Sequence, residues 1–192
     1  AKNLGITRPF IVTDPGIKAA GLLAKVEDAL GMAPAGVFAD TVPNPLESQA
    51  KQAAEAYKAS GADGLIAVGG GSSMDHAKAI GLLVSHPDPL ETYAAITGGA
   101  KKIKKIPPLI AIPTTAGTGS EVSVGTVVIL ENGRKETIVS PNLIPATAIC
   151  DPDLTLGLPA GLTAATGMDA LTHCIEAVLA PAVNPPAEGI GY

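Results

Sequence analysis

The chain has 192 residues and a net charge of −5, with 46% hydrophobic and only 16% charged residues. This balance excludes an intrinsically disordered chain, because it offers enough apolar surface for a buried core. Aromatic residues make up only 3% of the chain, so the core is expected to be aliphatic, as it is in parallel sheets covered by helices.

The charge pattern, the hydropathy and the cysteines argue against nucleic-acid binding, a membrane span and a disulfide framework. The basic run at 101–105 is expected to be a solvated loop before a buried strand, since an acidic chain without interleaved aromatics is a poor nucleic-acid binder. No apolar run reaches ~18 residues, so we expect no membrane span. Cys150 and Cys174 lack the spacing of a disulfide framework or a zinc ribbon. We therefore expect a reducing, cytoplasmic setting.

Short apolar runs alternate with segments of helical periodicity through most of the chain. Strands are expected at Pro9–Thr13, Val37–Ala39, Leu65–Val68, Leu109–Ile112 and Ala148–Cys150. Helices are expected at Ile17–Leu30, Leu46–Ser60 and Met74–Val84. A β-hairpin is expected around Asn132-Gly133, between Thr126–Leu130 and Glu136–Val139. The alternation predicts an α/β fold, a Rossmann-like doubly wound parallel sheet with helices on both faces.

The character of the sequence changes near Leu158. Ala, Thr, Leu, His and Glu at helical spacing replace the strand-like runs. We therefore expect an α/β domain at 1–156 and the first helices of an all-α domain at 157–192.

A glycine run, Gly69–Ser72, follows the third expected strand and leads directly into a helix. Glycines let backbone N–H groups approach a phosphate without a Cβ in the way, and a helix N-terminus offers further free donors. Ser72 and Ser73 are expected to cap this helix and to donate to the phosphate. The run is not the G-x-G-x-x-G dinucleotide fingerprint. A tight strand-to-helix turn without a ligand is the alternative.

A second loop, Pro113–Glu121, also follows a strand and is rich in hydroxyl groups and glycines. Loops at the carboxyl ends of neighbouring parallel strands face one crevice, where open α/β sheets bind ligands. Asp14, at the end of the first strand, is suited to accept from an adenosine ribose hydroxyl, which favours NAD over NADP. The alternative is that Asp14 only opens the turn Asp14-Pro15-Gly16.

Asp169 and His173 are four residues apart and share one face of a predicted helix. A carboxylate and an imidazole in this arrangement suit a divalent metal such as Fe²⁺ or Zn²⁺. The alternatives are a simple hydrogen bond between the two side chains and a rival pair of His173 with Glu176. His76 and His86 cluster with no other candidate ligand.

Three runs together resemble the iron-containing (group III) alcohol dehydrogenases: GGGSSMDHAKAI (Gly69–Ile80), IPTTAGTGSEV (Ile112–Val122) and LTAATGMDALTHCIEA (Leu162–Ala177). The last two are specific to this family, whereas the glycine run is shared with glycerol dehydrogenase-like and dehydroquinate synthase-like relatives. The resemblance implies metal-assisted hydride transfer between a small alcohol or aldehyde and NAD(P), in a homodimer of the full-length protein. It makes 1–156 the dinucleotide-binding domain and 157–192 the start of the metal- and substrate-binding domain.

The resemblance also assigns site residues position by position. For NAD, with NADP as the alternative, it implies contacts from Asp14, Asn44, Gly70, Gly71, Ser72, Asp75, Thr114, Thr115, Thr118, Ser123, Lys135 and Leu154. For Fe²⁺, with Zn²⁺ as the alternative, it implies Asp169 and His173 as the first two of four ligands. It names no side chain of this chain as a catalytic acid or base.

Members of the family are about twice as long and supply two further histidine ligands downstream. We therefore expect this chain to hold half of a metal site. Two alternatives follow: an NAD(H)-binding module without turnover, and an enzyme of the glycerol dehydrogenase or maleylacetate reductase type.

Overall fold

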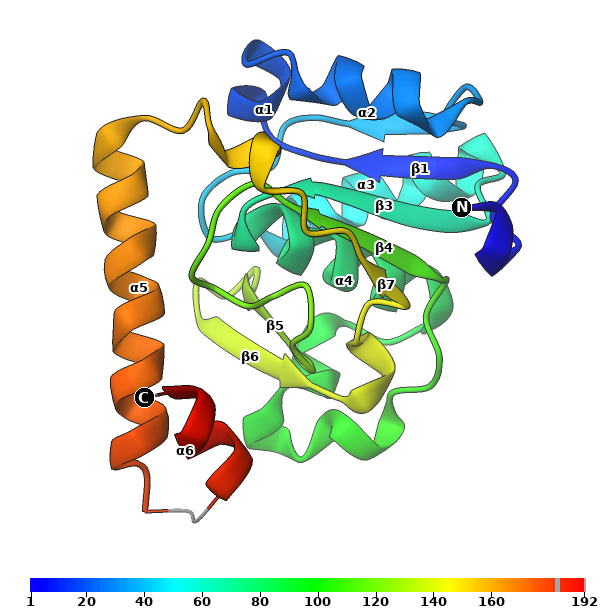
Figure 1. Cartoon of the computed structure of the whole chain (residues 1–192). Helices are drawn as coiled ribbons and strands as arrows, with labels where there is room; N and C mark the ends of the chain where they lie inside the picture. Colours follow the sequence, from blue (N-terminus) through cyan, green and yellow to red (C-terminus); the bar gives the residue numbers. More distant parts are fainter. Residues whose placement is uncertain (182–183, 192) are drawn as a thin grey trace.

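The computed structural model describes residues 1–181 and 184–191. It contains a five-stranded parallel sheet with the strand order β2-β1-β3-β4-β7 and a two-stranded antiparallel sheet, β5-β6 (Figure 1). The strands are β1 (Pro9–Val12), β2 (Gly36–Phe38), β3 (Gly64–Gly69), β4 (Leu109–Pro113), β5 (Gly125–Ile129), β6 (Lys135–Val139) and β7 (Thr147–Ala148). The α-helices are α1 (Pro15–Ala19), α2 (Leu22–Leu30), α3 (Glu47–Ser60), α4 (Gly71–Ser85), α5 (Ala160–Leu179) and α6 (Pro185–Gly191). Short 3₁₀ turns lie at Lys2–Leu4, Leu90–Tyr93, Ala95–Thr97, Gly99–Lys102, Pro141–Leu143 and Pro152–Thr155.

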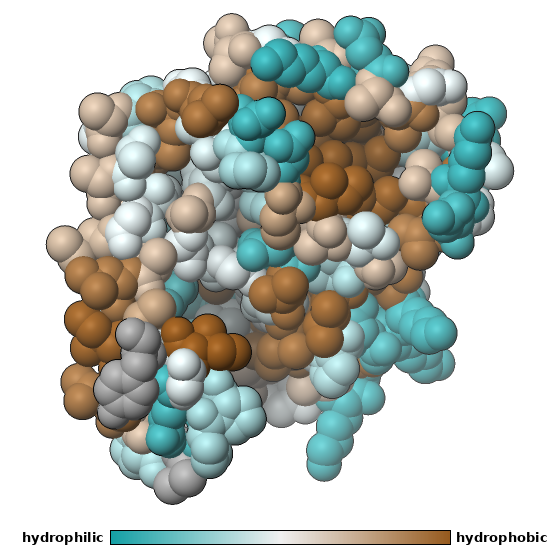
Figure 2. Space-filling model, in the orientation of Figure 1, coloured by the Kyte–Doolittle hydropathy of each residue, from teal (hydrophilic) through white to brown (hydrophobic). Residues whose placement is uncertain are grey.

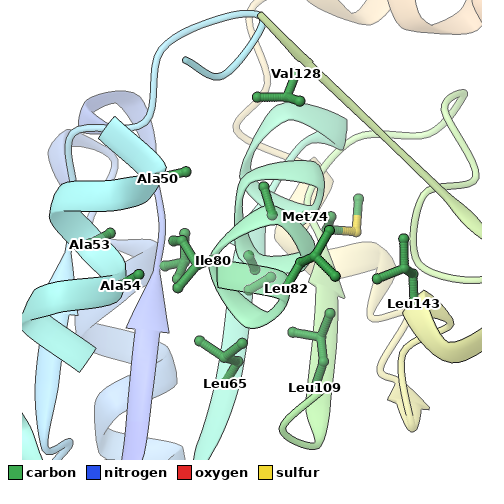
Figure 3. Close-up of a cluster of buried hydrophobic side chains, with 14 of the residues drawn as sticks. Ala50, Ala53, Ala54, Leu65, Met74, Ile80, Leu82, Leu109, Val128 and Leu143 are labelled. Atoms are coloured by element: carbon green, nitrogen blue, oxygen red, sulfur yellow. The ribbon is translucent and has the colours of Figure 1, made fainter. Parts of the chain in front are cut away.

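Helices cover both faces of the parallel sheet. Strands β1, β3 and β4 bury every one of their residues, as expected for strands inside a parallel sheet. On one face, α3 and α4 pack on the sheet, and Ile80 of α4 lies in one cluster with Leu65 and Leu109 (Figure 3). On the other face, Leu23 of α2 joins a second cluster with Ile66. The sheet therefore has an aliphatic core on each side, and the predicted α/β class is confirmed.

Most predicted elements occur within a residue or two of their expected bounds. The strand expected at Val37–Ala39 is observed one residue earlier, at Gly36–Phe38. The last strand is shorter than expected, Thr147–Ala148, although Ile149 N still donates to Ala111 O at 2.8 Å. The four lysines of the run at 101–105 are exposed before β4, as predicted.

The single helix predicted at Ile17–Leu30 is wrong. Gly21 has a φ of +74°, a left-handed conformation that separates α1 from α2. The first of the two helices begins because the Asp14 carboxylate Oδ1 accepts from Ile17 N at 3.0 Å. The periodic pattern in this segment was real, but one glycine changes the direction of the chain within it.

Helix α4 begins at Gly71, three residues earlier than predicted. Its N-cap is Gly70, and no side chain caps it, so the predicted capping by Ser72 and Ser73 is wrong. Both serines lie inside the first turn, and Ser73 Oγ donates instead to Asp14 Oδ2 at 3.0 Å.

Helices α5 and α6 form a pair at the C-terminal end of the chain, at the left of Figure 1. No residue of α5 is buried by the part of the chain that the structure describes. Five of its large apolar side chains are exposed: Leu162, Met168, Leu171, Ile175 and Leu179. Hydrophobic surface is visible at the left of Figure 2, where α5 lies. Residues 182, 183 and 192 of the predicted helical domain lie outside the described residues. None of the described helices is both long and apolar enough to cross a membrane.

Candidate functional site

The two predicted ligand loops leave the sheet side by side. Strands β3 and β4 are parallel neighbours, and Gly69 is in register with Pro113 at their carboxyl ends. A backbone hydrogen bond links the two segments one residue beyond β4, where Thr114 N donates to Gly69 O at 3.0 Å. Both loops therefore begin at the edge where open α/β sheets bind ligands.

The second loop packs directly on the glycine turn. A Cβ added to Gly71 would lie 2.7 Å from Thr118 Cγ2, and one added to Gly70 would lie 3.3 Å from Thr115 Oγ1. Gly71 is therefore needed for the approach of the two loops, and Gly70 leaves room only for a tight contact; this reason for glycine is independent of any phosphate. The same turn leaves the first N–H groups of α4 without partners inside the helix, and Gly71 and Ser72 are only partly buried.

Asp14 uses both carboxylate oxygens within the protein. Oδ1 accepts from Ile17 N, and Oδ2 accepts from Ser73 Oγ, each at 3.0 Å. The turn-opening role considered from the sequence therefore occurs, and it is combined with a link to the glycine turn. A carboxylate has about four lone-pair positions, so Asp14 retains capacity for a further donor such as a ribose hydroxyl.

Two other predicted contacts, Asn44 and Lys135, come together although they lie 91 residues apart in sequence. Lys135 Nζ donates to Asn44 Oδ1 at 2.7 Å, and both residues are exposed. Asn44 adopts a φ of +56°, and Pro43 and Pro45 flank it. Leu154 lies on the opposite side of the sheet, in the cluster of Ile66 and Leu23.

Of the remaining polar residues predicted to contact the cofactor, Thr114 is buried, and its Oγ1 has no partner among the described residues. A buried hydroxyl without a partner is costly, and a bound ligand or water would supply one. Ser123 Oγ accepts from Gly125 N at 3.0 Å. The Asp75 carboxylate is also engaged inside the protein, by Ser120 and Val127.

A groove of about 590 Å³ lies between α2 and the strand β4. Its floor is aliphatic, with Ile66, Ile110 and Ile112. Leu154 is the one predicted cofactor residue that lines it. The glycine turn and the threonine-rich loop are not part of this groove, so the case for a cofactor site rests on the two loops.

The structure brings the predicted metal pair together. On α5, His173 Nε2 lies 3.9 Å from Asp169 Oδ1, and both side chains are about half exposed. His173 Nδ1 lies 2.9 Å from Gly117 O. Because a carbonyl can only accept, Nδ1 carries a proton, so Nε2 is the nitrogen that offers a lone pair to a ligand in the neutral ring. The rival pair of His173 with Glu176 forms no ion pair among the described residues.

The donor set fits half of an Fe²⁺ or Zn²⁺ site, since an imidazole with a free nitrogen stands beside a carboxylate. No group of three or more His, Cys, Asp or Glu side chains suited to a metal occurs among residues 1–181 and 184–191. Gly117 allows the close approach of the loop to α5: it has a φ of +123°, and a Cβ there would lie 2.5 Å from Thr166 O.

Three residues that organise this site were missed in the sequence: Lys78, Ser120 and Gly117. Lys78 is fully buried and binds the second loop. The available signal was a lysine inside an otherwise apolar helix, three residues after Asp75. Gly117 gave no separate signal, because glycines are frequent in this loop.

The parallel sheet with ligand loops at its carboxyl edge defines a Rossmann-like α/β protein. The chain belongs to the iron-containing alcohol dehydrogenase family, whose profile matches residues 1–152.

Individual relatives and solved structures support membership of this family. The chain is 55% identical over 190 residues to a 4-hydroxybutyrate dehydrogenase of Cupriavidus necator, covering 98% of the chain and 50% of that relative. It superposes with a TM-score of 0.92 and 36% identity on a crystal structure of 1,3-propanediol oxidoreductase, over 99% of this chain and 50% of that one. A sulfoacetaldehyde reductase from Bifidobacterium kashiwanohense, solved in complex with NAD⁺, matches with a TM-score of 0.82 and 37% identity, over 92% and 47%. The chain thus spans about half the length of these relatives.

Proposed function

We propose that this chain is the cofactor-binding part of a metal-assisted alcohol dehydrogenase, which moves hydride between a small alcohol and NAD(P). The observation that carries the proposal is the meeting of two ligand loops at the carboxyl edge of β3 and β4, with Thr118 packed on Gly71. The names of the relatives, which include an NAD⁺ complex, support it. By the same reasoning, 1–156 is the dinucleotide-binding domain and 157–192 begins a metal- and substrate-binding domain, in a cytoplasmic homodimer of the full-length protein.

The proposed cofactor contacts are the residues assigned from the resemblance, and the structure suggests a more specific role for several of them. The pyrophosphate would lie over Gly70 and Gly71, where it would accept from the free N–H groups of α4. Asp14 would accept from the adenosine ribose and disfavour a 2′-phosphate, which favours NAD over NADP. Asp75 would act indirectly, because one of its carboxylate oxygens already accepts from Ser120 of the threonine-rich loop and the other from Val127 of β5.

The proposed metal ligands are Asp169 and His173. A bound Fe²⁺ or Zn²⁺ would act as a Lewis acid that lowers the pKa of the alcohol hydroxyl. The protein's own part is orientation: the Gly117 carbonyl fixes the ring of His173, and Gly117 belongs to the loop that also contacts the glycine turn. The proposed cofactor and metal sites are therefore joined by one loop.

Isothermal titration of the chain with NADH tests the cofactor site. We expect saturable binding with one site per chain and weaker binding of NADPH. Absence of any NADH binding would show that the cofactor proposal is wrong.

A turnover assay then separates an enzyme from an NAD(H)-binding module. The first substrate to test is 4-hydroxybutyrate with NAD⁺ and added Fe²⁺, since the relative at 55% identity carries that name. Turnover that is lost in His173→Ala would support the metal-assisted reaction. NADH binding without turnover would favour the module.

A further inference from the structure

The loop that covers the glycine turn has little regular structure of its own. Residues 114–124 contain no helix or strand. One internal backbone bond, from Val122 N to Gly119 O, closes a single turn. Backbone bonds fix its two ends, from Thr114 N to Gly69 O and from Ser140 N to Val124 O. The residues between these ends are held by side chains from elsewhere in the protein, most of them from α4.

Lys78 provides the largest share of these contacts. It is fully buried, and its Nζ donates to Ser120 O and Gly125 O, each at 2.8 Å, to Ser123 O at 3.0 Å and to Ser120 Oγ at 3.3 Å. An ammonium group has three protons and no acceptor, so these four oxygens occupy it completely. Lys78 consequently has no donor left for a phosphate.

Asp75, less than one turn before Lys78 on α4, binds Ser120 of the same segment and the first residues of β5. Its Oδ1 accepts from Ser120 Oγ at 2.6 Å and its Oδ2 from Val127 N at 3.0 Å. Its carbonyl oxygen accepts from Thr126 Oγ1 at 2.7 Å. The two side chains together thus hold residues 120–127 against α4.

The charges in this cluster are partly compensated. Burial lowers the pKa of Lys78 to about 8, and the negative charges of Asp75 and Glu121 oppose this shift. Burial raises the pKa of Asp75, opposed by hydrogen bonds from Ser120 and Val127 and by the charge of Lys78. Buried and partly buried charges are a weak source of stability compared with apolar side chains of the same size. The arrangement is better explained by the single position that it gives the loop.

We propose that Lys78 and Asp75 form an internal clamp that positions the threonine-rich loop over the glycine turn and thereby sets the affinity for the dinucleotide. Lys78 is a positioning residue, because it acts through Ser120 and, further along the same loop, through Thr118, which packs on Gly71. The part of this inference that concerns the cofactor rests on the proposed function, whereas the clamp itself can be tested in the free protein.

The test combines hydrogen exchange and NADH titration on the same variants. Lys78→Met keeps a long side chain in the helix but removes all four hydrogen bonds. We expect faster amide exchange in residues 118–127 of the free protein and a dissociation constant for NADH raised about tenfold, at a temperature where the variant is fully folded. A merely structural lysine would lower the unfolding temperature and leave the NADH affinity of the folded protein unchanged.

Two further variants make the result interpretable. Lys58→Met, at an exposed lysine on α3, is the matched control and should change neither readout. Ser120→Ala removes one hydroxyl of the clamp and should show the same changes to a smaller extent. If Lys78→Met does not fold, Ser120→Ala still tests the clamp.

Unchanged exchange in both clamp variants would overturn the clamp. Faster exchange with unchanged NADH affinity would overturn its role in binding. Failure of the wild-type chain to bind NADH would instead overturn the proposed function and the role in binding, while the exchange data would still judge the clamp.

Discussion

The α/β part of the chain, before Leu158, and the helical pair α5–α6 differ in how they are stabilised. In the α/β part, two aliphatic clusters lie on the two faces of the sheet, and strands β1, β3 and β4 bury every residue. In α5, no residue is buried by the described part of the chain, and five large apolar side chains are exposed. The two parts meet where Gly117 contacts α5.

This difference separates the surroundings of the two proposed sites. The proposed cofactor loops are attached to a rigid, well-packed sheet, which suits precise positioning of a ligand. The proposed metal ligands lie on a helix whose own packing contributes little. Changes in the α/β part should therefore affect stability and NADH binding together, whereas changes on α5 should leave stability nearly unchanged and affect the proposed metal site.

The largest expected effect is a loss of stability in the α/β part. Ile80 is fully buried between the sheet and α3 (Figure 3), so Ile80→Ala should lower the free energy of unfolding by about 3 kcal/mol, through lost burial and a residual cavity. Leu171→Ala, at an exposed position of α5, is the contrasting control and should change it by less than about 0.5 kcal/mol. Urea unfolding measures both. Equal losses would show that the two parts are not stabilised differently.

The second effect is a loss of stability in acid. His76 is fully buried, with Nδ1 2.9 Å from Thr41 Oγ1, and burial lowers its pKa to about 4. The folded protein keeps this ring neutral, so between pH 6.5 and about 4 the unfolded chain binds the extra proton. The free energy of unfolding should therefore fall as the pH is lowered through this window, by about 3 kcal/mol in total. Unfolding of wild type and His76→Leu across the window measures the difference in slope, and equal slopes would contradict the assignment.

The third effect concerns the junction of the two loops. In Gly71→Val, the Cβ would lie within 2.7 Å of Thr118, and the branched side chain would also cover the free N–H groups of α4. We expect NADH affinity to fall by at least a hundredfold, or about 2.7 kcal/mol, as measured by calorimetry. Gly157→Val, where no atom lies within 4 Å of the added Cβ, should bind as the wild type does. Retained binding in the Gly71 variant would mean that the dinucleotide lies elsewhere.

The smallest effect tests the contact between the two parts. Gly117→Ala would place a Cβ 2.5 Å from Thr166 O and should separate the loop from α5, so that His173 loses its bond to the Gly117 carbonyl. Nitrogen chemical shifts of the ring should then show loss of the Nδ1–H tautomer in the metal-free chain. Gly119→Ala is the matched control, because Gly119 also has a positive φ, +62°, but open space around it. The same His173 tautomer in the wild type and in both variants would show that the Gly117 carbonyl does not set it.

Much of the fold could be predicted because its signals are local. Apolar runs and turn residues located β1, β3 and β4 almost to the residue, and the spacing of Asp169 and His173 placed both on one helix face. The errors were also local in origin. Gly21 lies inside the segment predicted as one helix, and the serines after the glycine run were predicted as caps. Sequence alone does not show at which residue the first turn of a helix begins.

The sequence by itself determined the α/β class, the two loops at the sheet edge, the position of Asp169 and His173 on one helix face, and the family. Only the tertiary structure decided which of these residues act on one another. Ser73 donates to Asp14 across 59 positions, Lys78 holds Ser120 across 42, and Gly117 contacts His173 across 56. The reason is physical: hydrogen bonds of this kind depend on distances set by the packing of whole elements, and no periodic pattern in the chain encodes them. The glycine turn is thus the clearest case, since its need for glycine comes from the approach of Thr118 as much as from any phosphate.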